Sequence, residues 1–375
     1  MNNIEVIPVV SPAELDRFIK LPALLYANDP AFVPPLVLER SEALSPVKNP
    51  YFQHAETQFW LARRGGRDVG RISAQIDRLV AEADVGHFGM IAAEDDAEVF
   101  AALFAAAEAW LRERGKTRVL GPFNLSINEE TGLLVDGFDT PPVMMMGHDP
   151  RYSAPHIEAL GYAKAKDLIA YWYDIDHELT AAARRKIDKR KPEALTVRTL
   201  DKKRYKEEFD MVTSIFNDAW SLNWGFIAFT QAEIAHMAKS LKPLIDPNCV
   251  AIVEMNGEAV GFGIALPNLN ELVADFGGRL LPFNWIKLLY RLWRGARSAR
   301  VPLMGIRRSF SGSLAGGLAP FLIIDALRNG LRNKGVRHVE LSWILEDNRA
   351  MRHVIESLGA HPYKTYRVYE KTLGL

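Results

Sequence analysis

Apolar residues recur along the chain with two different periods, and each period predicts one kind of element. Between Asp95 and Gly115 they return every three or four positions, which is the spacing of one face of a helix. Residues 59–63 and 69–76 form short apolar runs on either side of the Gly65-Gly66 turn, which predicts two paired strands. The N-terminal part of the chain is therefore expected to contain a hairpin followed by a long helix.

Further elements of the N-terminal half follow from the same patterns. The sequence Ser11-Pro12-Ala13-Glu14 has the composition of a capping box, so a helix is expected to begin there. Residues 117–120 and 168–173 predict strands, and the apolar run Val143-Met144-Met145-Met146 predicts a buried strand. A short helix is expected over His156–Leu160.

The C-terminal half repeats this order of elements. Its predicted hairpin, helix, strand, helix and strand cover residues 251–265, 320–333, 338–344, 348–358 and 366–370. The pentad Ile157-Glu158-Ala159-Leu160-Gly161 has a counterpart in Ile355-Glu356-Ser357-Leu358-Gly359. A shared order and a shared pentad together indicate an internal duplication. The predicted fold class is α/β, with a mixed sheet and two similar halves in tandem.

A charged run separates the two halves. Residues 184–192 read Arg-Arg-Lys-Ile-Asp-Lys-Arg-Lys-Pro, which is typical of a solvated linker. We therefore expect an N-terminal domain over 1–180, a basic linker over 181–200 and a C-terminal domain over 201–375. Nucleic acid is not favoured as a partner, because 46 basic and 46 acidic residues give a formal net charge of zero.

Composition also indicates the compartment. The 375 residues contain one cysteine, Cys249, so no intramolecular disulfide is expected and the reducing cytosol fits best. The N-terminus lacks the basic and apolar segments of a signal peptide, and no apolar run reaches the ~18 residues of a membrane span. A cytoplasmic protein is expected, with any membrane association peripheral and on the inner face.

Several stretches together resemble the GNAT superfamily, the Gcn5-related N-acetyltransferases. These stretches are residues 28–30, 33–35, 50–52, 54–56, 340–352 and 366–371. They are similar to one bacterial subfamily of tandem GNAT-like proteins over nearly the whole chain, and some bacterial ceramide synthases are also GNAT-like. The resemblance implies an N-acyltransferase that uses acyl-CoA, acetyl or long-chain, as cosubstrate and needs no metal. It also implies a catalytic C-terminal domain and a degenerate N-terminal one.

A GNAT protein holds the pyrophosphate of coenzyme A between a strand and the start of a helix, where unpaired N–H groups face the phosphates. The candidate is the Gly-rich stretch 307–317, which departs from the usual pattern of the superfamily at Ser311. The residues expected at the cofactor are Ile306, Arg307, Arg308, Ser309, Gly312, Ser313, Gly316, Gly317 and Asn348. The alternative is a flexible loop. The N-terminal half has only Gly86-His87-Phe88-Gly89 before its helix, so no cofactor is assigned to it.

Attack on a thioester requires a neutral amine, and a free alkyl ammonium has a pKa near ~10. The resemblance places Glu346 where substrate enters, so Glu346 is the first candidate for the base; the alternative is helix-start electrostatics. Many GNAT proteins carry a Tyr general acid where this chain has Ile355. Either Tyr366 or Tyr369 substitutes for it, or no general acid is used. The alternative for both tyrosines is cross-strand packing.

Aromatic residues mark the predicted acceptor side. In GNAT folds the region after the first long helix lines the acceptor pocket, which assigns Asn223, Trp224 and Phe226 to the substrate. Trp343 is assigned to the same pocket. A core aromatic cluster is the alternative for all of these aromatic residues.

The stretch from Arg279 to Ile324 contains eight basic residues and no acidic one. Within residues 282–294, four apolar side chains recur at helical spacing opposite three basic ones. The apolar residues are Trp285, Leu288, Leu289 and Leu292, and the basic residues are Lys287, Arg291 and Arg294. A basic, Trp-bearing amphipathic helix is typical of binding to an anionic membrane surface. The alternative is a helix that covers the domain.

Together these patterns predict transfer of an acyl group from a CoA thioester to a primary amine. The basic amphipathic segment favours a lipophilic acceptor such as a sphingoid base. Two alternatives stay open: acetylation of a small polar or protein amine, and a module that binds acyl-CoA or lipid without turnover. Ser311 and Ile355 favour the last of these.

Overall fold

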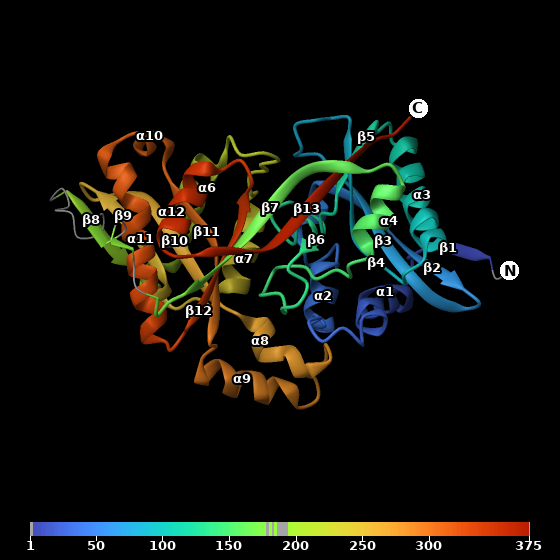
Figure 1. The fold of residues 1–375 in the computed structure, drawn as a ribbon, viewed down its shortest axis with the longest axis horizontal. Helices are drawn as coiled ribbons and strands as arrows, with labels where there is room; N and C mark the ends of the chain where they lie inside the picture. The colour runs from blue at the N-terminus through green and yellow to red at the C-terminus, as the bar shows by residue number, and fades with distance from the viewer. Residues whose placement is uncertain (1–2, 178–179, 182–183, 186–193, 375) are drawn as a thin grey trace. The chain divides into compact units, whose positions relative to one another are not determined.

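The computed structural model describes residues 3–177, 180–181, 184–185 and 194–374. Contacts among the residues divide the chain into two compact units (Figure 1). Unit 1 contains residues 1–168, 273–288 and 364–375, and unit 2 contains residues 169–272 and 289–363. Residues 182–183 and 186–193 of the predicted linker lie outside the described residues, so the predicted limits at 180 and 201 stay predictions.

Unit 1 is a mixed sheet covered by helices. Its strands follow the order β1-β2-β3-β4-β5-β13, and β6 also pairs with β13. The strands are β1 (Ile4–Pro8), β2 (Ala55–Arg64), β3 (Arg67–Asp77), β4 (Val85–Ala93), β5 (Arg118–Gly121), β6 (Leu133–Asp136) and β13 (His361–Thr372). The helices are α1 (Pro12–Leu25), α2 (Val37–Ala43), α3 (Ala97–Glu113) and α4 (Ser153–Ala159), with a 3₁₀ turn η1 (Pro50–Gln53).

The predicted helix between Asp95 and Gly115 is confirmed as α3, and both of its ends have a local cause. Asp96 caps the helix, because its carboxylate accepts hydrogen bonds from two N–H groups of the first turn. Gly115 follows the helix with a φ of +73°, a left-handed conformation that favours glycine. Between these ends the apolar face, including Phe100 and Leu103, is buried in the core of unit 1.

In unit 2 the strands follow the order β7-β12-β11-β10-β9-β8, again with parallel and antiparallel pairs. Its strands are β7 (Ala163–Asp174), β8 (Leu195–Thr199), β9 (Val250–Met255), β10 (Glu258–Pro267), β11 (Ser298–Ile306) and β12 (His338–Leu345). Its helices and 3₁₀ turns are η2 (Lys202–Arg204), α6 (Tyr205–Trp220), α7 (Gln231–Leu241), η3 (Pro247–Cys249), α8 (Leu269–Val273), α9 (Asn284–Arg294), α10 (Arg308–Ser311), α11 (Leu314–Asn333) and α12 (Arg349–Ser357). Four elements, β7, α8, α9 and β13, contribute residues to both units, and the 3₁₀ turn η4 (Ala274–Phe276) belongs to unit 1. Within the described ranges, no helix is long and apolar enough to cross a bilayer.

The predicted strand over Val143–Met146 is wrong. These residues form a turn, and Met145 has a left-handed φ of +61°. Val143, Met144 and Met146 are nevertheless buried. The prediction that this segment is buried was therefore correct for three of its four residues. The prediction of a strand failed, because a run of four apolar residues does not distinguish a strand from a buried loop.

The helix predicted from Pro320 begins earlier in the structure, at Leu314. Ser313 caps it by accepting a hydrogen bond of 2.9 Å from the N–H of Gly316. Pro320 lies inside the helix rather than at its first turn. Gly316 and Gly317, which the sequence placed in a loop, are consequently residues of the first helical turn.

Candidate active site

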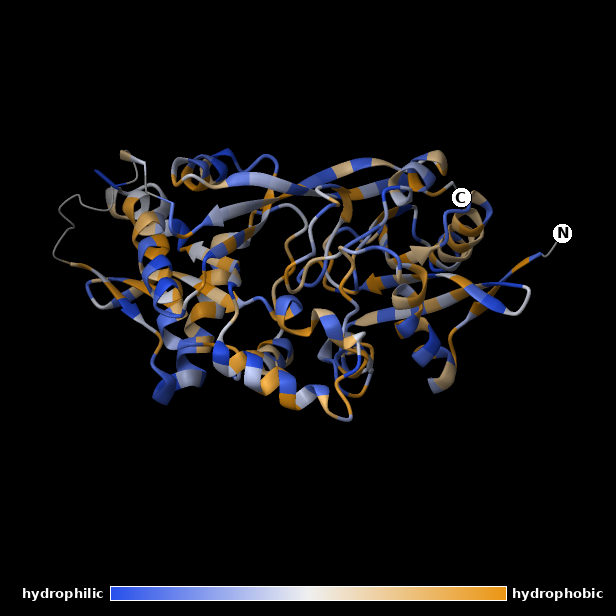
Figure 2. Cartoon of the chain, turned by 60° about the horizontal axis from the view of Figure 1, so that its bottom comes forward, coloured by the Kyte–Doolittle hydropathy of each residue, from blue (hydrophilic) through white to orange (hydrophobic). Residues whose placement is uncertain are grey.

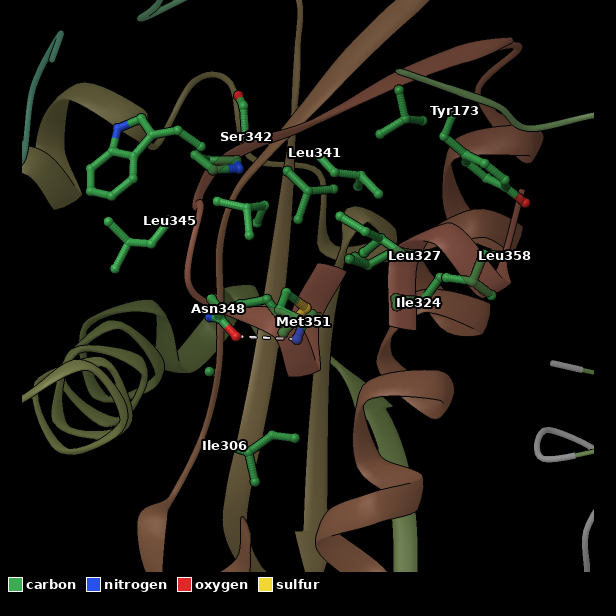
Figure 3. A pocket seen from close by; sticks show the side chains of 18 of the residues that line it. Tyr173, Ile306, Ile324, Leu327, Leu341, Ser342, Leu345, Asn348, Met351 and Leu358 are labelled. Atoms are coloured by element: carbon green, nitrogen blue, oxygen red, sulfur yellow. Dashed lines mark hydrogen bonds between the residues drawn. The ribbon is translucent and has the colours of Figure 1, made fainter. Parts of the chain in front are cut away.

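Strands β11 and β12 part from each other in the middle of unit 2. Their parallel pairing runs from Ser298 opposite His338 to Val301 opposite Leu341. Both strands then continue, β11 to Ile306 and β12 to Leu345. A cavity of about 230 Å³ lies where they diverge (Figure 3).

The cavity is lined mainly by aliphatic side chains. They come from β11, from β12, and from the helices α11 and α12. Those labelled in Figure 3 include Ile306, Ile324, Leu327, Leu341, Leu345, Met351 and Leu358. Polar lining residues are fewer, and they include Asn223, Arg328, Ser342 and Asn348. An apolar hollow with a small number of polar groups is the usual form of a site for a small, largely apolar ligand.

A buried charge network adjoins this cavity. Glu340 is 0% exposed and Arg300 is 4% exposed, and the two residues lie opposite each other on β12 and β11. Their charged groups are 3.8 Å apart, between Arg300 Nε and Glu340 Oε1. A buried carboxylate is stable as an anion when it is paired with a cation and hydrogen-bonded.

Two hydroxyl groups complete the network. Ser342 Oγ donates to Glu340 Oε1 and accepts a bond of 2.8 Å from Arg300 Nε. The hydroxyl of Tyr363 donates to the other carboxylate oxygen, Glu340 Oε2. Ser342 lines the cavity, whereas Tyr363 is not among the lining residues. Ser342 therefore belongs both to this buried network and to the residues that line the cavity.

The predicted cofactor residues fall into two groups. Ile306 and Asn348 line the cavity, and the side chain of Asn348 also caps α12 by accepting 3.1 Å from the N–H of Met351 (Figure 3). The other predicted residues, Arg307, Arg308, Ser309, Gly312, Ser313, Gly316 and Gly317, lie in α10, in the first turn of α11 or directly beside them. The first turn of a helix carries N–H groups that attract anions.

The two arginines of this stretch have partners in the protein. Arg307 donates from Nε to the carbonyl of Ala259 at 3.1 Å, and Arg308 donates from Nη1 to Ser221 Oγ at 3.2 Å. These bonds hold Arg307 against β10 and Arg308 against the end of α6. The glycines differ in the space around them: a Cβ on Gly317 would meet nothing within 4 Å, whereas a Cβ on Gly316 would lie 1.8 Å from the carbonyl oxygen of Phe310.

The predicted acceptor residues are only partly brought together. Asn223 and Trp343 line the cavity, and the ring of Trp343 lies edge-on to Trp220 with centroids 6.1 Å apart. Trp224 and Phe226 are half-buried and are not lining residues. Phe226 packs on Phe216, with centroids 5.9 Å apart, in an aromatic cluster at the end of α6.

None of the predicted catalytic residues is among those that line the cavity. Glu346 is half-buried just past β12, and its backbone carbonyl accepts 2.9 Å from Arg352 Nη1. Tyr366 and Tyr369 are fully buried in the part of β13 that belongs to unit 1. The hydroxyl of Tyr369 donates 2.9 Å to Glu158, and burial raises the pKa of that hydroxyl. This placement favours the packing role that the sequence left open for both tyrosines.

Comparison with known proteins gives the family. A tandem GNAT protein from the clavulanic acid biosynthesis pathway superimposes with a TM-score of 0.60 at 15% identity, over 100% of this chain and 99% of its own. A GCN5-related N-acetyltransferase from Sphaerobacter thermophilus gives 0.54 at 14% identity, over 99% and 96%. A protein of Caulobacter vibrioides, named bacterial ceramide synthase, is 54% identical over 99% of this chain and 98% of its own.

The chain belongs to the tandem GNAT family of N-acyltransferases that includes this ceramide synthase. Protein YghO of Escherichia coli is 46% identical over 96% of this chain and 93% of its own. No model of a known protein family matches the sequence. The predicted fold of two GNAT-like halves is confirmed.

The two halves of this N-acyltransferase differ at the place where their parallel strands separate. In unit 1, the backbone after β5 forms hydrogen bonds with β4 beyond the end of their pairing. Strand β4 pairs with β5 only from Val85 to His87. Beyond that point the N–H of Phe123 donates 2.8 Å to the carbonyl of Phe88, and the N–H of Met90 donates 2.8 Å to Asn124 Oδ1. In unit 1, residues 123 and 124 therefore form hydrogen bonds with β4 beyond the end of its pairing with β5. In unit 2 the cavity lies at the corresponding place, where β11 and β12 diverge. The absence of a cofactor in this half stays a prediction.

Sequence reasoning missed the network of Arg300, Glu340, Ser342 and Tyr363. The available signal was a charged residue inside each of two apolar strands, Arg300 in Ser298–Ile306 and Glu340 in His338–Leu345. Charges at strand centres are costly unless they are paired, so opposite charges in neighbouring strands indicate an ion pair. Among the residues that the structure describes, no group of three or more metal-ligating side chains occurs.

Proposed function

We propose that this N-acyltransferase transfers an acyl group from a CoA thioester to the primary amine of a lipid, such as a sphingoid base. The observation that carries the proposal is the aliphatic cavity in unit 2, one of whose lining residues, Ser342, is hydrogen-bonded to the buried carboxylate of Glu340. The name of the Caulobacter relative supports the choice of a lipid product.

The size and lining of the cavity suit a hydrocarbon chain. A cavity of 150 Å³ lined by apolar side chains is enough to hold benzene, and this one measures about 230 Å³. Each methylene group that leaves water for such a site contributes about 0.8 kcal/mol. A long acyl chain or a lipid amine therefore gains more from this cavity than an acetyl group or a polar amine does.

The start of α11 fits the phosphates of coenzyme A. The helix end offers N–H groups, Gly312 and Gly317 leave open space beside it, and Arg307 and Arg308 lie next to it. When bound, the CoA thioester supplies the acyl carbonyl that the amine attacks. The residues of the chain then hold the phosphates, bury the hydrocarbon and accept the proton.

The transfer requires one proton acceptor. The amine nitrogen forms a bond to the carbonyl carbon, the carbon–sulfur bond breaks, and the amine loses a proton while the CoA thiolate leaves. A hydroxyl has two acceptor lone pairs, and Arg300 Nε occupies one of those on Ser342 Oγ. The other accepts the proton of the amine as Ser342 passes its own to Glu340. Glu346, the base predicted from sequence, is the competing candidate.

A mass-spectrometric screen tests the proposal. Purified protein is incubated with acyl-CoAs of increasing chain length, from acetyl to long-chain, against sphingoid bases and against small polar amines. We expect an amide product from long-chain acyl-CoA and a sphingoid base. Products formed only from acetyl-CoA and polar amines would refute the lipid assignment. Binding of acyl-CoA without any product would favour the non-catalytic module.

A further inference from the structure

Exposed apolar side chains gather on α9 and the turn before it. In the described residues, half of the large apolar side chains that are exposed belong to this segment. They are Leu281, Phe283, Trp285, Ile286, Leu289, Tyr290 and Trp293, here called the outer patch. Trp293 is 80% exposed and Phe283 is 72% exposed. Figure 2 shows hydrophobic and hydrophilic residues alternating along this helix. Such a concentration of apolar surface marks an interaction site.

The helix has two distinct faces. Leu288, Arg291 and Leu292 are half-buried, and Arg291 Nη1 donates 2.6 Å to the carbonyl of Leu272. These residues hold the helix to the protein. The opposite face carries Ile286, Leu289, Tyr290 and Trp293, whose spacing of three, four and seven positions places them in one exposed stripe.

This division corrects the sequence-based view of the segment. The sequence grouped Leu288 and Leu292 with the apolar surface and Arg291 with the charged one. In the structure all three are on the inner face, and Ile286, Tyr290 and Trp293 take the outer one. Because the apolar stripe faces outward, the helix does more than cover the domain.

The charged residues on α9 and in the chain directly before and after it, from 276 to 324, are all basic. Lys287 and Arg294 are exposed on the helix, and Arg279 and Arg297 are exposed just before and after it. The sequence contains no acidic residue between 276 and 324. A second copy of the chain would bring the same cations to a shared interface, so self-association is disfavoured. A surface that combines negative charge with an apolar interior is complementary to the patch.

We infer that the outer patch docks on an anionic lipid bilayer, with α9 lying in the plane of the interface. Ile286, Leu289, Tyr290 and Trp293 enter the boundary between headgroups and acyl chains, while Lys287 and Arg294 contact the negative headgroups. This binding does not require acyl transfer. It therefore stands or falls independently of the proposed function.

Vesicle binding measures the two contributions separately. Co-sedimentation is carried out with phosphatidylcholine vesicles, with and without phosphatidylglycerol, at low and high salt. We expect binding to the anionic vesicles that salt weakens without abolishing, because salt screens charges and leaves apolar burial intact. Each basic residue near the surface strengthens binding about fivefold, so K287Q/R294Q should weaken it about thirtyfold.

Matched controls distinguish the patch from general surface effects. K202Q/K203Q removes two exposed charges elsewhere, and V47S/L24S removes two exposed apolar side chains elsewhere. Both should bind as the wild type does. I286S/W293S should lose binding to both kinds of vesicle, and bound wild-type protein should show quenching of Trp fluorescence by brominated lipid that is reduced in W293F.

Three results would overturn the inference. One is wild-type protein that ignores anionic vesicles at low salt. The second is an equal loss of binding in the patch variants and the control variants. The third is a concentration-dependent dimer that I286S/W293S abolishes, which would make the patch a protein interface. Circular dichroism of each variant confirms that the changes leave the fold intact.

Discussion

Ser342 and Tyr363 offer a matched test of how the protein removes the proton from its substrate. Both hydroxyls donate to the same carboxylate, one to each oxygen of Glu340. They differ in position, since Ser342 lines the cavity and Tyr363 is not a lining residue. If Glu340 accepts the proton through Ser342, Ser342→Ala should slow acyl transfer and Tyr363→Phe should not.

The expected magnitudes follow from the burial of the network. Ser342→Ala removes hydrogen bonds to two buried charged groups, and Tyr363→Phe removes one bond to the same carboxylate. Bonds of this kind contribute about 1.5–3 kcal/mol each, so both variants should lose stability measurably. Loss of a general base lowers the rate about 10²- to 10⁴-fold, and only Ser342→Ala should show this loss. Glu340→Gln is less informative, because leaving Arg300 buried without its anion costs about 3–5 kcal/mol.

The assay is single-turnover formation of the amide at saturating acyl-CoA, with urea unfolding of each variant in parallel. Equal rate losses in Ser342→Ala and Tyr363→Phe would show that the carboxylate acts only in stability. An unchanged rate in a folded Ser342→Ala variant would refute the proposed route and leave Glu346 as the base.

Three further predictions address other parts of the molecule. Glu346→Gln should change the rate only a few-fold if Glu340 is the base, whereas a loss of about 100-fold would move that role to Glu346. Gly317→Glu should abolish acyl-CoA binding in calorimetry by adding negative charge at the start of α11, and Gly317→Ala should preserve it because the space there is open; Gly316 cannot serve for this test, since a side chain there collides with the backbone. Burial lowers the pKa of His87 to about 4, whereas the ordinary pKa of histidine is 6.5. The neutral ring therefore stabilises the folded protein fully above pH 6.5, and this contribution is lost as the pH falls through about 4. The free energy of unfolding of the wild type relative to that of His87→Phe should therefore fall by about 3 kcal/mol between pH 7 and pH 4, as measured by urea titrations of both proteins.

Elements with a local cause were predictable from the sequence. The capping box at Ser11 and Glu14 forms as expected, and Asn348 caps the helix that its position predicts. The duplicated order of hairpin, helix, strand, helix and strand also predicted two similar halves, and the resemblance to tandem GNAT proteins implied their fold. These features depend on neighbours within a few residues, or on a period that the chain itself displays.

Features that depend on distant partners were not predictable in the same way. The conformation of Val143–Met146 and the start of α11 before Pro320 were both mistaken, because an apolar run and a proline each fit more than one local structure. The two faces of α9 were also assigned incorrectly. Periodicity identifies an apolar stripe, but the surrounding protein decides which side of the helix it covers.

The sequence by itself determined the fold family, the helix caps and the concentration of positive charge near α9. Only the tertiary structure brought Arg300 to Ser342, 42 residues away, and separated β11 from β12 beyond Val301 and Leu341. The physical reason is that the two strands of a parallel pair come from segments that are far apart in the sequence. The number of residues between such segments does not determine which residues of the two strands lie opposite each other. That register places Arg300 opposite Glu340, one residue pair before the end of the pairing between β11 and β12.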